Sequence, residues 1–455
     1  MIQSLSLINV KLPMNDEKHL YSLTVENGQW TSINKQDDLI LTPDAVPIDS
    51  MTGIGKNEKK LDLQGKVLLP GLIDAHMHLD KSFCLPQVGN KSGTLWEAVQ
   101  NYSEAVPAFS KEEIKSRIMR SALQAVSFGT TAIRTHLDFH VKYGSAVALR
   151  TVEAALEAKE ALSPYVDLQL FPLTPFSGFN SDEIEVLEEA IRMGMSGIGG
   201  APHLSETPGQ DIDRLFRLAQ KHDCPIDLHT DENDDPHVRT LGHIAKRTID
   251  FDFSGRVTVD HLCSLASMSD ADAGTLIERM AEAKIDAVTL PGANLYLQGR
   301  HDTFPVRRGI TRVKEILAAG IPLATASDNI HDPFHPFGRG DLIQIGLLTA
   351  YAAHMGSSAD IRTILQMITE IPASILEIEG YGVRVGNEAD FVVLDGTTPE
   401  ELFTMLPERR WVYRKKGWLK LAAKRAGWVD PVLDRYWNDA EINFPFGNNT
   451  FVPRI

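Results

Sequence analysis

Residues 68–78 read LLPGLIDAHMH, a short apolar run that ends in two histidines. Seven further β-like runs follow, each separated from the last by a segment long enough for a helix. Eight short runs alternating with helical segments predict a parallel sheet, and the count of eight favours a closed (β/α)8 TIM barrel. The seven runs are 131–139 (TAIRTHLDF), 166–174 (VDLQLFPLT), 196–204 (SGIGGAPHL), 225–232 (PIDLHTDE), 256–262 (RVTVDHL), 286–294 (DAVTLPGAN) and 321–329 (IPLATASDN).

Three of the intervening segments carry clear helix signals. Ser110 and Glu113 have the spacing of a capping box, and apolar residues at helical spacing follow them as far as Gly129. Apolar residues recur in the same way across 181–194 and across 313–320, and each of these segments also ends in glycine. We therefore expect helices in all three places.

The two ends of the chain have a different pattern of apolar residues from the middle. Residues 1–68 and 376–425 contain short period-two apolar runs broken by turn residues, which indicates antiparallel β structure. Two such flanks around a barrel of residues 69–375 predict one discontinuous β domain. The remaining residues, 426–455, are rich in aromatic side chains, and we expect this C-terminal extension to pack on its own barrel or on a neighbouring subunit of a homo-oligomer.

Charge and hydropathy exclude several classes of partner. The 455 residues contain 45 Lys and Arg against 61 Asp and Glu, a net charge of −16 that would repel nucleic acids and anionic membranes. No apolar run is long enough to span a bilayer, and the first residues lack the pattern of a signal peptide. We expect a cytoplasmic protein whose partner is a small molecule.

Ligand-capable side chains gather where the predicted strands end. Such ends form the active-site rim of a parallel barrel. Two histidines separated by one residue point to the same face of a strand, and further histidines and an aspartate end other strands. Imidazole and carboxylate groups brought together in this way predict a site for a divalent metal such as Zn²⁺ or Fe²⁺. The candidates are His76, His78, His229, His261 and Asp328.

A metal that activates water also needs a group that moves protons. Glu232 lies three residues after His229, on the loop that rises from the strand end, where it could reach a bound substrate. The alternative is that the stretch DENDDP is only a solvated acidic loop, which we expect for Asp234 and Asp235. We interpret Glu232 as a catalytic acid and base.

Several of these segments together carry a family resemblance. GLIDAHMHLDKSF, IDLHTDENDD, VTVDHLCSL and ASDNIHDPFHPFG resemble the amidohydrolase superfamily, in particular its cytosine deaminase and N-isopropylammelide aminohydrolase branches. The resemblance implies a (β/α)8 barrel with a small β-sandwich built from both termini. It also implies one Zn²⁺ or Fe²⁺ per subunit, a proton shuttle at Glu232 and a hydroxide-orienting histidine at His261. The implied metal ligands are His76, His78, His229 and Asp328, of which Asp328 also helps to position the hydroxide.

The chain departs from the cytosine deaminase pattern around the expected substrate. Leu173 stands where those enzymes have a glutamine, and Asn329 and Phe334 replace an aspartate and a tryptophan. His203 is expected either to face the substrate or to make a structural hydrogen bond at the rim. The run 196–204 offers no lysine of the kind that bridges two metals in some relatives, so a single metal is expected. The predicted substrate contacts are therefore Leu173, His203, Asn329 and Phe334.

These features predict a hydrolytic deaminase of a free nitrogen heterocycle, such as a substituted aminopyrimidine or s-triazine. Two alternatives remain open at this point. A cyclic amide hydrolase of the same superfamily would release no ammonia. A non-catalytic metal-binding scaffold would have no use for the proton shuttle expected at Glu232.

Overall fold

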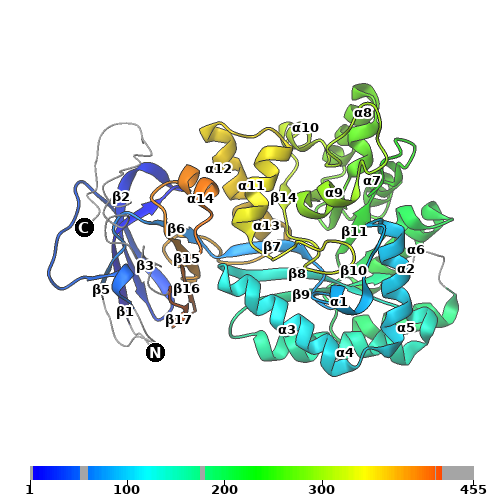
Figure 1. Ribbon diagram of the computed structural model, residues 1–455, viewed down its shortest axis with the longest axis horizontal. Coiled ribbons are helices and arrows are strands. Elements are labelled where there is room, and N and C mark those ends of the chain that lie inside the picture. The colour runs from blue at the N-terminus through cyan, green and yellow to red at the C-terminus, as the bar shows by residue number, and fades with distance from the viewer. Residues whose placement is uncertain (1–3, 52–59, 175–179, 416, 423–455) are drawn as a thin grey trace.

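The computed structural model describes residues 4–51, 60–174, 180–415 and 417–422. Each of the eight predicted runs contains a strand, and these strands pair in parallel in the order in which they occur along the chain. This confirms the predicted barrel (Figure 1). The run 286–294 is a strand only over its first four residues, because a helix begins at Pro291. The strands are β7 (Leu72–Met77), β8 (Thr130–Asp138), β9 (Asp167–Thr174), β10 (Ile198–Gly200), β11 (Ile226–Thr230), β12 (Val257–His261), β13 (Asp286–Thr289) and β14 (Leu323–Thr325).

The first and last strands meet at the rim of the barrel. Met77 forms a parallel bridge with Asp328, which lies three residues past the end of β14. The backbone N–H of Asp328 donates a hydrogen bond of 2.9 Å to the carbonyl oxygen of His76. Closure of the barrel therefore places two candidate metal ligands, far apart in sequence, beside each other.

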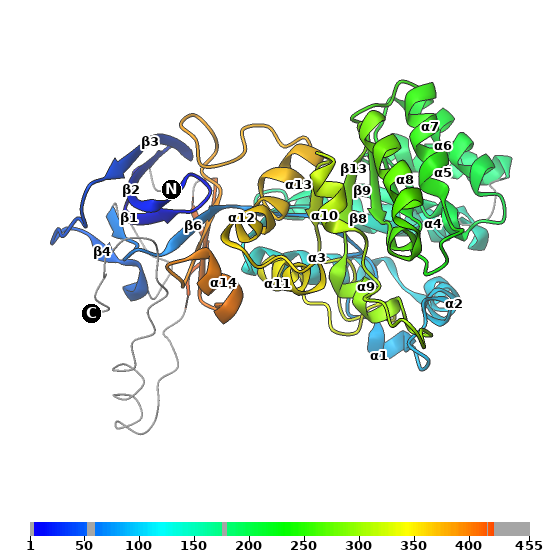
Figure 2. The ribbon, with the colours of Figure 1, turned by 90° about the horizontal axis from the view of Figure 1, so that it is seen from above.

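Helices follow most of the strands, and the predicted helix signals are confirmed. Ser110 and Glu113 form the capping box of α3, and Gly129 lies two residues past the end of this helix with φ of +105°. Figure 2 shows α5, α6, α7 and α8 on the side of the barrel away from the terminal sheet. The helices are α1 (Leu85–Val88), α2 (Leu95–Ala105), α3 (Lys111–Ser127), α4 (Ser145–Leu162), α5 (Ser181–Met193), α6 (Pro208–His222), α7 (Thr240–Asp250), α8 (Asp270–Glu282), α9 (Pro291–Leu297), α10 (Val313–Ala318), α11 (Leu342–Ala352), α12 (Ser358–Met367), α13 (Glu370–Ile375) and α14 (Pro399–Met405).

Both ends of the chain contribute to a second, mixed sheet set to one side of the barrel (Figure 1). Its order is β17-β16-β15-β6-β1-β2-β3, with β5 also pairing with β1 and with β4. The sheet folds over on itself, because the ring of Trp30 on β3 lies 5.2 Å from that of Phe391 on β15. The strands are β1 (Ser4–Leu12), β2 (Asp16–Glu26), β3 (Gln29–Gln36), β4 (Val46–Pro47), β5 (Lys60–Asp62), β6 (Val67–Pro70), β15 (Phe391–Leu394), β16 (Arg410–Arg414) and β17 (Gly417–Lys420).

The predicted discontinuous β domain is thus confirmed, whereas its exact limits stay a prediction. The expected C-terminal extension, 426–455, lies outside the described residues. No helix among the described residues is long and apolar enough to cross a membrane.

The interior of the barrel becomes polar beneath its rim. The guanidinium of Arg134 on β8 donates hydrogen bonds to Asp227 on β11 at 2.7 Å and to Thr258 on β12 at 3.2 Å. It also donates to Gln169 on β9 at 2.9 and 3.0 Å. This network ties neighbouring strands together below the candidate site, since buried charges are stable only when they are paired in this way.

Candidate metal centre and active site

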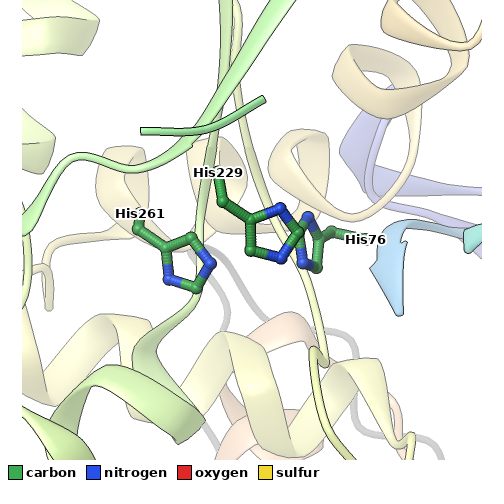
Figure 3. A group of neighbouring side chains, drawn as sticks. All are labelled: His76, His229 and His261. Atoms are coloured by element: carbon green, nitrogen blue, oxygen red, sulfur yellow. The ribbon is translucent and has the colours of Figure 1, made fainter. Parts of the chain in front are cut away.

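Strand alternation places the candidate histidines inside the barrel. His76 follows Asp74 at a spacing of two on β7, and His78 continues the series at the end of this strand. On β11, His229 stands above Asp227 in the same way. The side chains of all three histidines are almost completely buried. Figure 3 shows the rings of His76, His229 and His261 gathered in one place, although they come from three different strands.

Four ligand atoms converge within a few ångströms. The Nε2 atom of His78 lies 3.3 Å from Nε2 of His76, 3.1 Å from Nε2 of His229 and 3.3 Å from Oδ1 of Asp328. Nε2 of His76 lies 3.7 Å from the same carboxylate oxygen. Tetrahedral bonds of about 2.0–2.1 Å give ligand-to-ligand distances of about 3.3–3.4 Å. These pair distances are close to that spacing. Ligand atoms of His76, His78 and Asp328 lie within 4.8 Å of one another, and so do those of His76, His229 and His261.

The hydrogen-bonding state of the rings supports this interpretation. Nδ1 of His78 donates to the backbone oxygen of His136 at 3.1 Å, so its Nε2 carries a lone pair. Nδ1 of His76 lies 3.0 Å from Oδ2 of Asp260, which favours the proton on that nitrogen. Oδ1 of Asp328 is buried and has no hydrogen-bond partner among the described residues. A cation placed between lone pairs that face one another in a buried site stabilises them.

A second group of potential ligands lies on the far side of His76. It contains His76, His136, Asp227 and Asp260, all fully buried. Burial raises the pKa of Asp260 to about 7 even though Asp227 hydrogen-bonds to it. Within this group, Asp260 contacts Nδ1 of His76, whereas His78 and Asp328 lie near its Nε2. Carboxylates behind ligating histidines orient these rings, and we interpret the group as that support.

His261 enters the site through an unusual backbone conformation. Asp260 and His261 are neighbours on β12, so regular alternation would send their side chains to opposite faces. His261 instead has φ of +66°, in the left-handed region, and Asp328 likewise has φ of +59°. Non-glycine residues held in this region cost roughly 1–3 kcal/mol each and tend to occur at functional sites.

Asn294, on α9, fixes the state of His261. Its fully buried amide Nδ2 donates to Nδ1 of His261 at 3.0 Å and to Oε1 of Glu232 at 3.4 Å. Because Nδ1 of His261 accepts this hydrogen bond, the ring carries its proton on Nε2. Nε2 of His261 is buried and has no other partner among the described residues. His261 can thus act as a hydrogen-bond donor into the site, whereas Nδ1 contacts leave the lone pair on Nε2 in His76 and His78.

Glu232 is a buried carboxyl group at the same site. Its side chain is 7% exposed, and Oε1 lies 3.5 Å from Nδ1 of His261. Burial, followed by the nearby negative charge of Asp328, raises the pKa of Glu232 well above its ordinary value. A carboxyl group with a raised pKa can hold a proton near neutral pH and give it to a substrate.

One cavity of about 350 Å³ opens onto these groups. Its lining residues include His78, His229, Glu232, His261 and Asp328. The structure places three predicted substrate contacts, Leu173, Asn329 and Phe334, on its wall, whereas His203 is not among the lining residues. Nδ1 of His203 instead bonds to the backbone oxygen of His229 at 3.1 Å, which matches the structural alternative considered for this residue.

The cavity also contains a cation that the sequence analysis did not identify. Lys81 is 3% exposed, and its ammonium donates to Oδ1 of Asp138 at 3.0 Å. Burial alone lowers the pKa of Lys81, but the carboxylates of Asp138, Asp80 and Asp332 outweigh this effect and raise it above its ordinary value. The ammonium therefore stays charged at the cavity wall. A lysine three residues after a histidine pair gives no sequence signal of its own, because most lysines are exposed.

An eight-stranded barrel with this convergence of imidazole and carboxylate groups at its carboxyl-terminal rim defines a class of metal-dependent barrel hydrolases. Residues 94–429 match the model of the amidohydrolase family. The chain therefore belongs to this family, as the resemblance of its segments indicated, and it is a hydrolase that acts on carbon–nitrogen bonds other than peptide bonds.

Comparison with individual proteins also indicates membership of the amidohydrolase family. The chain is 33% identical over 366 residues to a pterin deaminase from Rhizobium rhizogenes, covering 78% of this chain and 81% of the relative. It is 31% identical over 389 residues to an N-isopropylammelide isopropyl amidohydrolase from Pseudomonas sp. strain ADP, covering 84% and 92%. The crystal structure of a 5-methylcytosine deaminase from Klebsiella pneumoniae superposes with a TM-score of 0.84 at 26% identity, covering 94% of this chain and all of the other.

Proposed function

We propose that the protein is a hydrolytic deaminase that removes an amino or alkylamino group from the ring of a free nitrogen heterocycle. The observation that carries the proposal is the buried Glu232, which lies in one cavity with the converging Nε2 atoms of His78 and His229 and Oδ1 of Asp328. The relatives named above, which are deaminases and amidohydrolases of nitrogen heterocycles, support it.

One divalent metal ion, Zn²⁺ or Fe²⁺, would be held by His76, His78, His229 and Asp328. When bound there, it supplies a Lewis acid that makes water a nucleophile near neutral pH. The fourth strand of the barrel, β10, supports a single metal ion. A Cβ atom on Gly199 would lie 3.0 Å from the backbone oxygens of Asp227 and Pro172 and 3.3 Å from Nδ1 of His136, so a metal-bridging lysine has no room there.

Side chains of the protein would then carry out the proton transfers and hydrogen bonding of the reaction. Glu232 gives a proton to a ring nitrogen, which makes the carbon bearing the amine more electrophilic. Glu232 then takes a proton from the oxygen that is added to the ring, gives it to the departing amine, and takes the second proton of that oxygen before the next turnover. Both transferred protons therefore come from the added water. Nε2–H of His261, its proton fixed by Asn294, donates a hydrogen bond to the oxygen that is added to the ring.

The wall of the cavity supports a ring with an apolar substituent. Leu173 and Phe334 are each 8% exposed and offer apolar surface where a glutamine and an indole N–H would select cytosine. Asn329 also lines the cavity, and its amide nitrogen already donates to Asp332 at 2.8 Å. An alkyl or similar group on the substrate would gain about 1–3 kcal/mol from such a surface. Substituted aminopyrimidines, aminotriazines and related rings are the expected class, and the cytoplasmic location and homo-oligomeric state stay predictions.

The test is release of ammonia or amine from a panel of amino-heterocycles by the metal-loaded protein. We expect turnover by the wild type and a loss of about 10²–10⁴-fold in Glu232→Gln, with metal content unchanged. Asp235→Asn is the matched control, because Asp235 is an exposed carboxylate in the same loop. Near-wild-type rates in Glu232→Gln, or cleavage of cyclic amides without amine release, would contradict the proposal.

A further inference from the structure

The ammonium group of Lys81 has hydrogen-bonding capacity left over. A lysine ammonium carries three N–H donors, and among the described residues Nζ of Lys81 makes one hydrogen bond, to Asp138. The same Nζ lies 4.3 Å from the ring centroid of Phe334 and 5.5 Å from that of Tyr102. These rings attract the cation but accept no conventional hydrogen bond. Lys81 therefore presents spare donors to the cavity that also contains Glu232.

The charges around Lys81 decide which acceptor fits. Asp138 alone neutralises the ammonium, and Asp80 and Asp332 are close enough to add negative potential. His140 lies on the other side of Asp138, with Nε2 3.5 Å from Oδ2. The site therefore has no surplus positive charge for a phosphate or carboxylate. A neutral carbonyl oxygen accepts a hydrogen bond from the ammonium group without being repelled by the neighbouring carboxylates.

We propose that Lys81 is a specificity-determining residue that donates to a ring oxo group of the substrate. This inference rests on the proposed function and narrows its substrate class to uncharged amino-heterocycles that carry a ring carbonyl, that is, amino-lactams of the pyrimidine, triazine or pteridine type. A ring without that oxygen leaves buried N–H donors of Lys81 unpaired. Sites built to hydrogen-bond a substrate group reject analogues that lack it by large factors.

Matched pairs of compounds with and without the oxo group test the proposal. We suggest isocytosine against 2-aminopyrimidine and pterin against 2-aminopteridine, each assayed with the wild type and with Lys81→Met. In the variant, we expect kcat/KM to fall at least about 100-fold for the oxo compound and less than about threefold for its partner. Each compound is compared between the wild type and the variant, and the two losses in kcat/KM are then compared with each other. The intrinsic difference in reactivity between the two rings cancels in this comparison. Equal losses for both members of a pair would overturn the proposal.

Separate controls distinguish a failure of the role proposed for Lys81 from a folding defect and from a failure of the proposed function. Lys81→Met leaves the buried Asp138 unpaired, so the double variant Lys81→Met/Asp138→Asn is measured beside it, with thermal unfolding and metal content. Binding of two unreactive rings, uracil and pyrimidine, is measured by calorimetry, because pyrimidine carries no ring oxo group. Tighter binding of uracil by the wild type, lost in both variants, supports the role of Lys81 even if no compound is deaminated. Failure of deamination alone would overturn only the proposed function, whereas uracil binding unaffected by the variants would overturn the role of Lys81.

Discussion

Replacement of Asn294 by leucine is expected to slow catalysis without removing the metal. Asn294 is fully buried and is the donor that holds Nδ1 of His261 as an acceptor, at 3.0 Å. Without it, the proton of His261 is free to move from Nε2 to Nδ1. A buried hydrogen bond of this kind is worth about 1–3 kcal/mol. Because about 1.4 kcal/mol corresponds to a factor of ten, kcat should fall about 5- to 150-fold.

The assay is steady-state amine release together with metal content by elemental analysis. Asn294→Asp should lose more activity than Asn294→Leu, because a carboxylate accepts a proton from Nδ1 of His261 and so favours the other tautomer. Asn9→Leu is the matched control, since Asn9 is equally buried but belongs to the terminal sheet. It should lower stability and leave kcat unchanged. Unchanged kcat in Asn294→Leu, or loss of its metal, would refute the reasoning about His261.

Four further substitutions have defined outcomes. Asp328→Ala should lower bound metal toward zero, whereas His261→Ala should keep the metal and slow turnover; full occupancy in Asp328→Ala would show that the ligand set is wrong. Gly199→Ala should lower the free energy of unfolding in urea by about 1–3 kcal/mol, because its Cβ would press on the backbone oxygens of the neighbouring strands. Leu173→Gln should raise kcat/KM for cytosine relative to alkyl-substituted aminopyrimidines, and an unchanged ratio would mean that Leu173 does not contact the substrate.

The barrel could be predicted from the sequence because each strand carries two signals at once. The apolar run marks the strand, and the polar residues at its end mark the rim, as at His76 and His229. Both signals are local in the sequence, so they can be recognised without knowledge of the tertiary contacts. The terminal sheet was predictable only in outline, because its strand order joins β6 to β1 and β15 across the whole chain.

The residues that the sequence did not reveal depend on long-range contacts. Asn294 ends the predicted β-like run 286–294 but lies on helix α9 in the structure, and only folding brings its amide to His261 and Glu232. Lys81 looks like an ordinary surface lysine until Asp138 on the next strand pairs with it. The position of His261 depends on a positive φ angle, which strand alternation does not predict.

The mass of the product formed in ¹⁸O-labelled water distinguishes a hydrolytic deaminase from a cyclic amide hydrolase. A suitable substrate is an alkyl-substituted amino-lactam, incubated with the metal-loaded protein. If the protein is a hydrolytic deaminase, the product keeps its ring intact, has lost the amine and has gained one labelled oxygen at the carbon that carried the amine. A product that contains the whole substrate plus one labelled water, with the ring opened and no amine released, would contradict the account and identify a cyclic amide hydrolase.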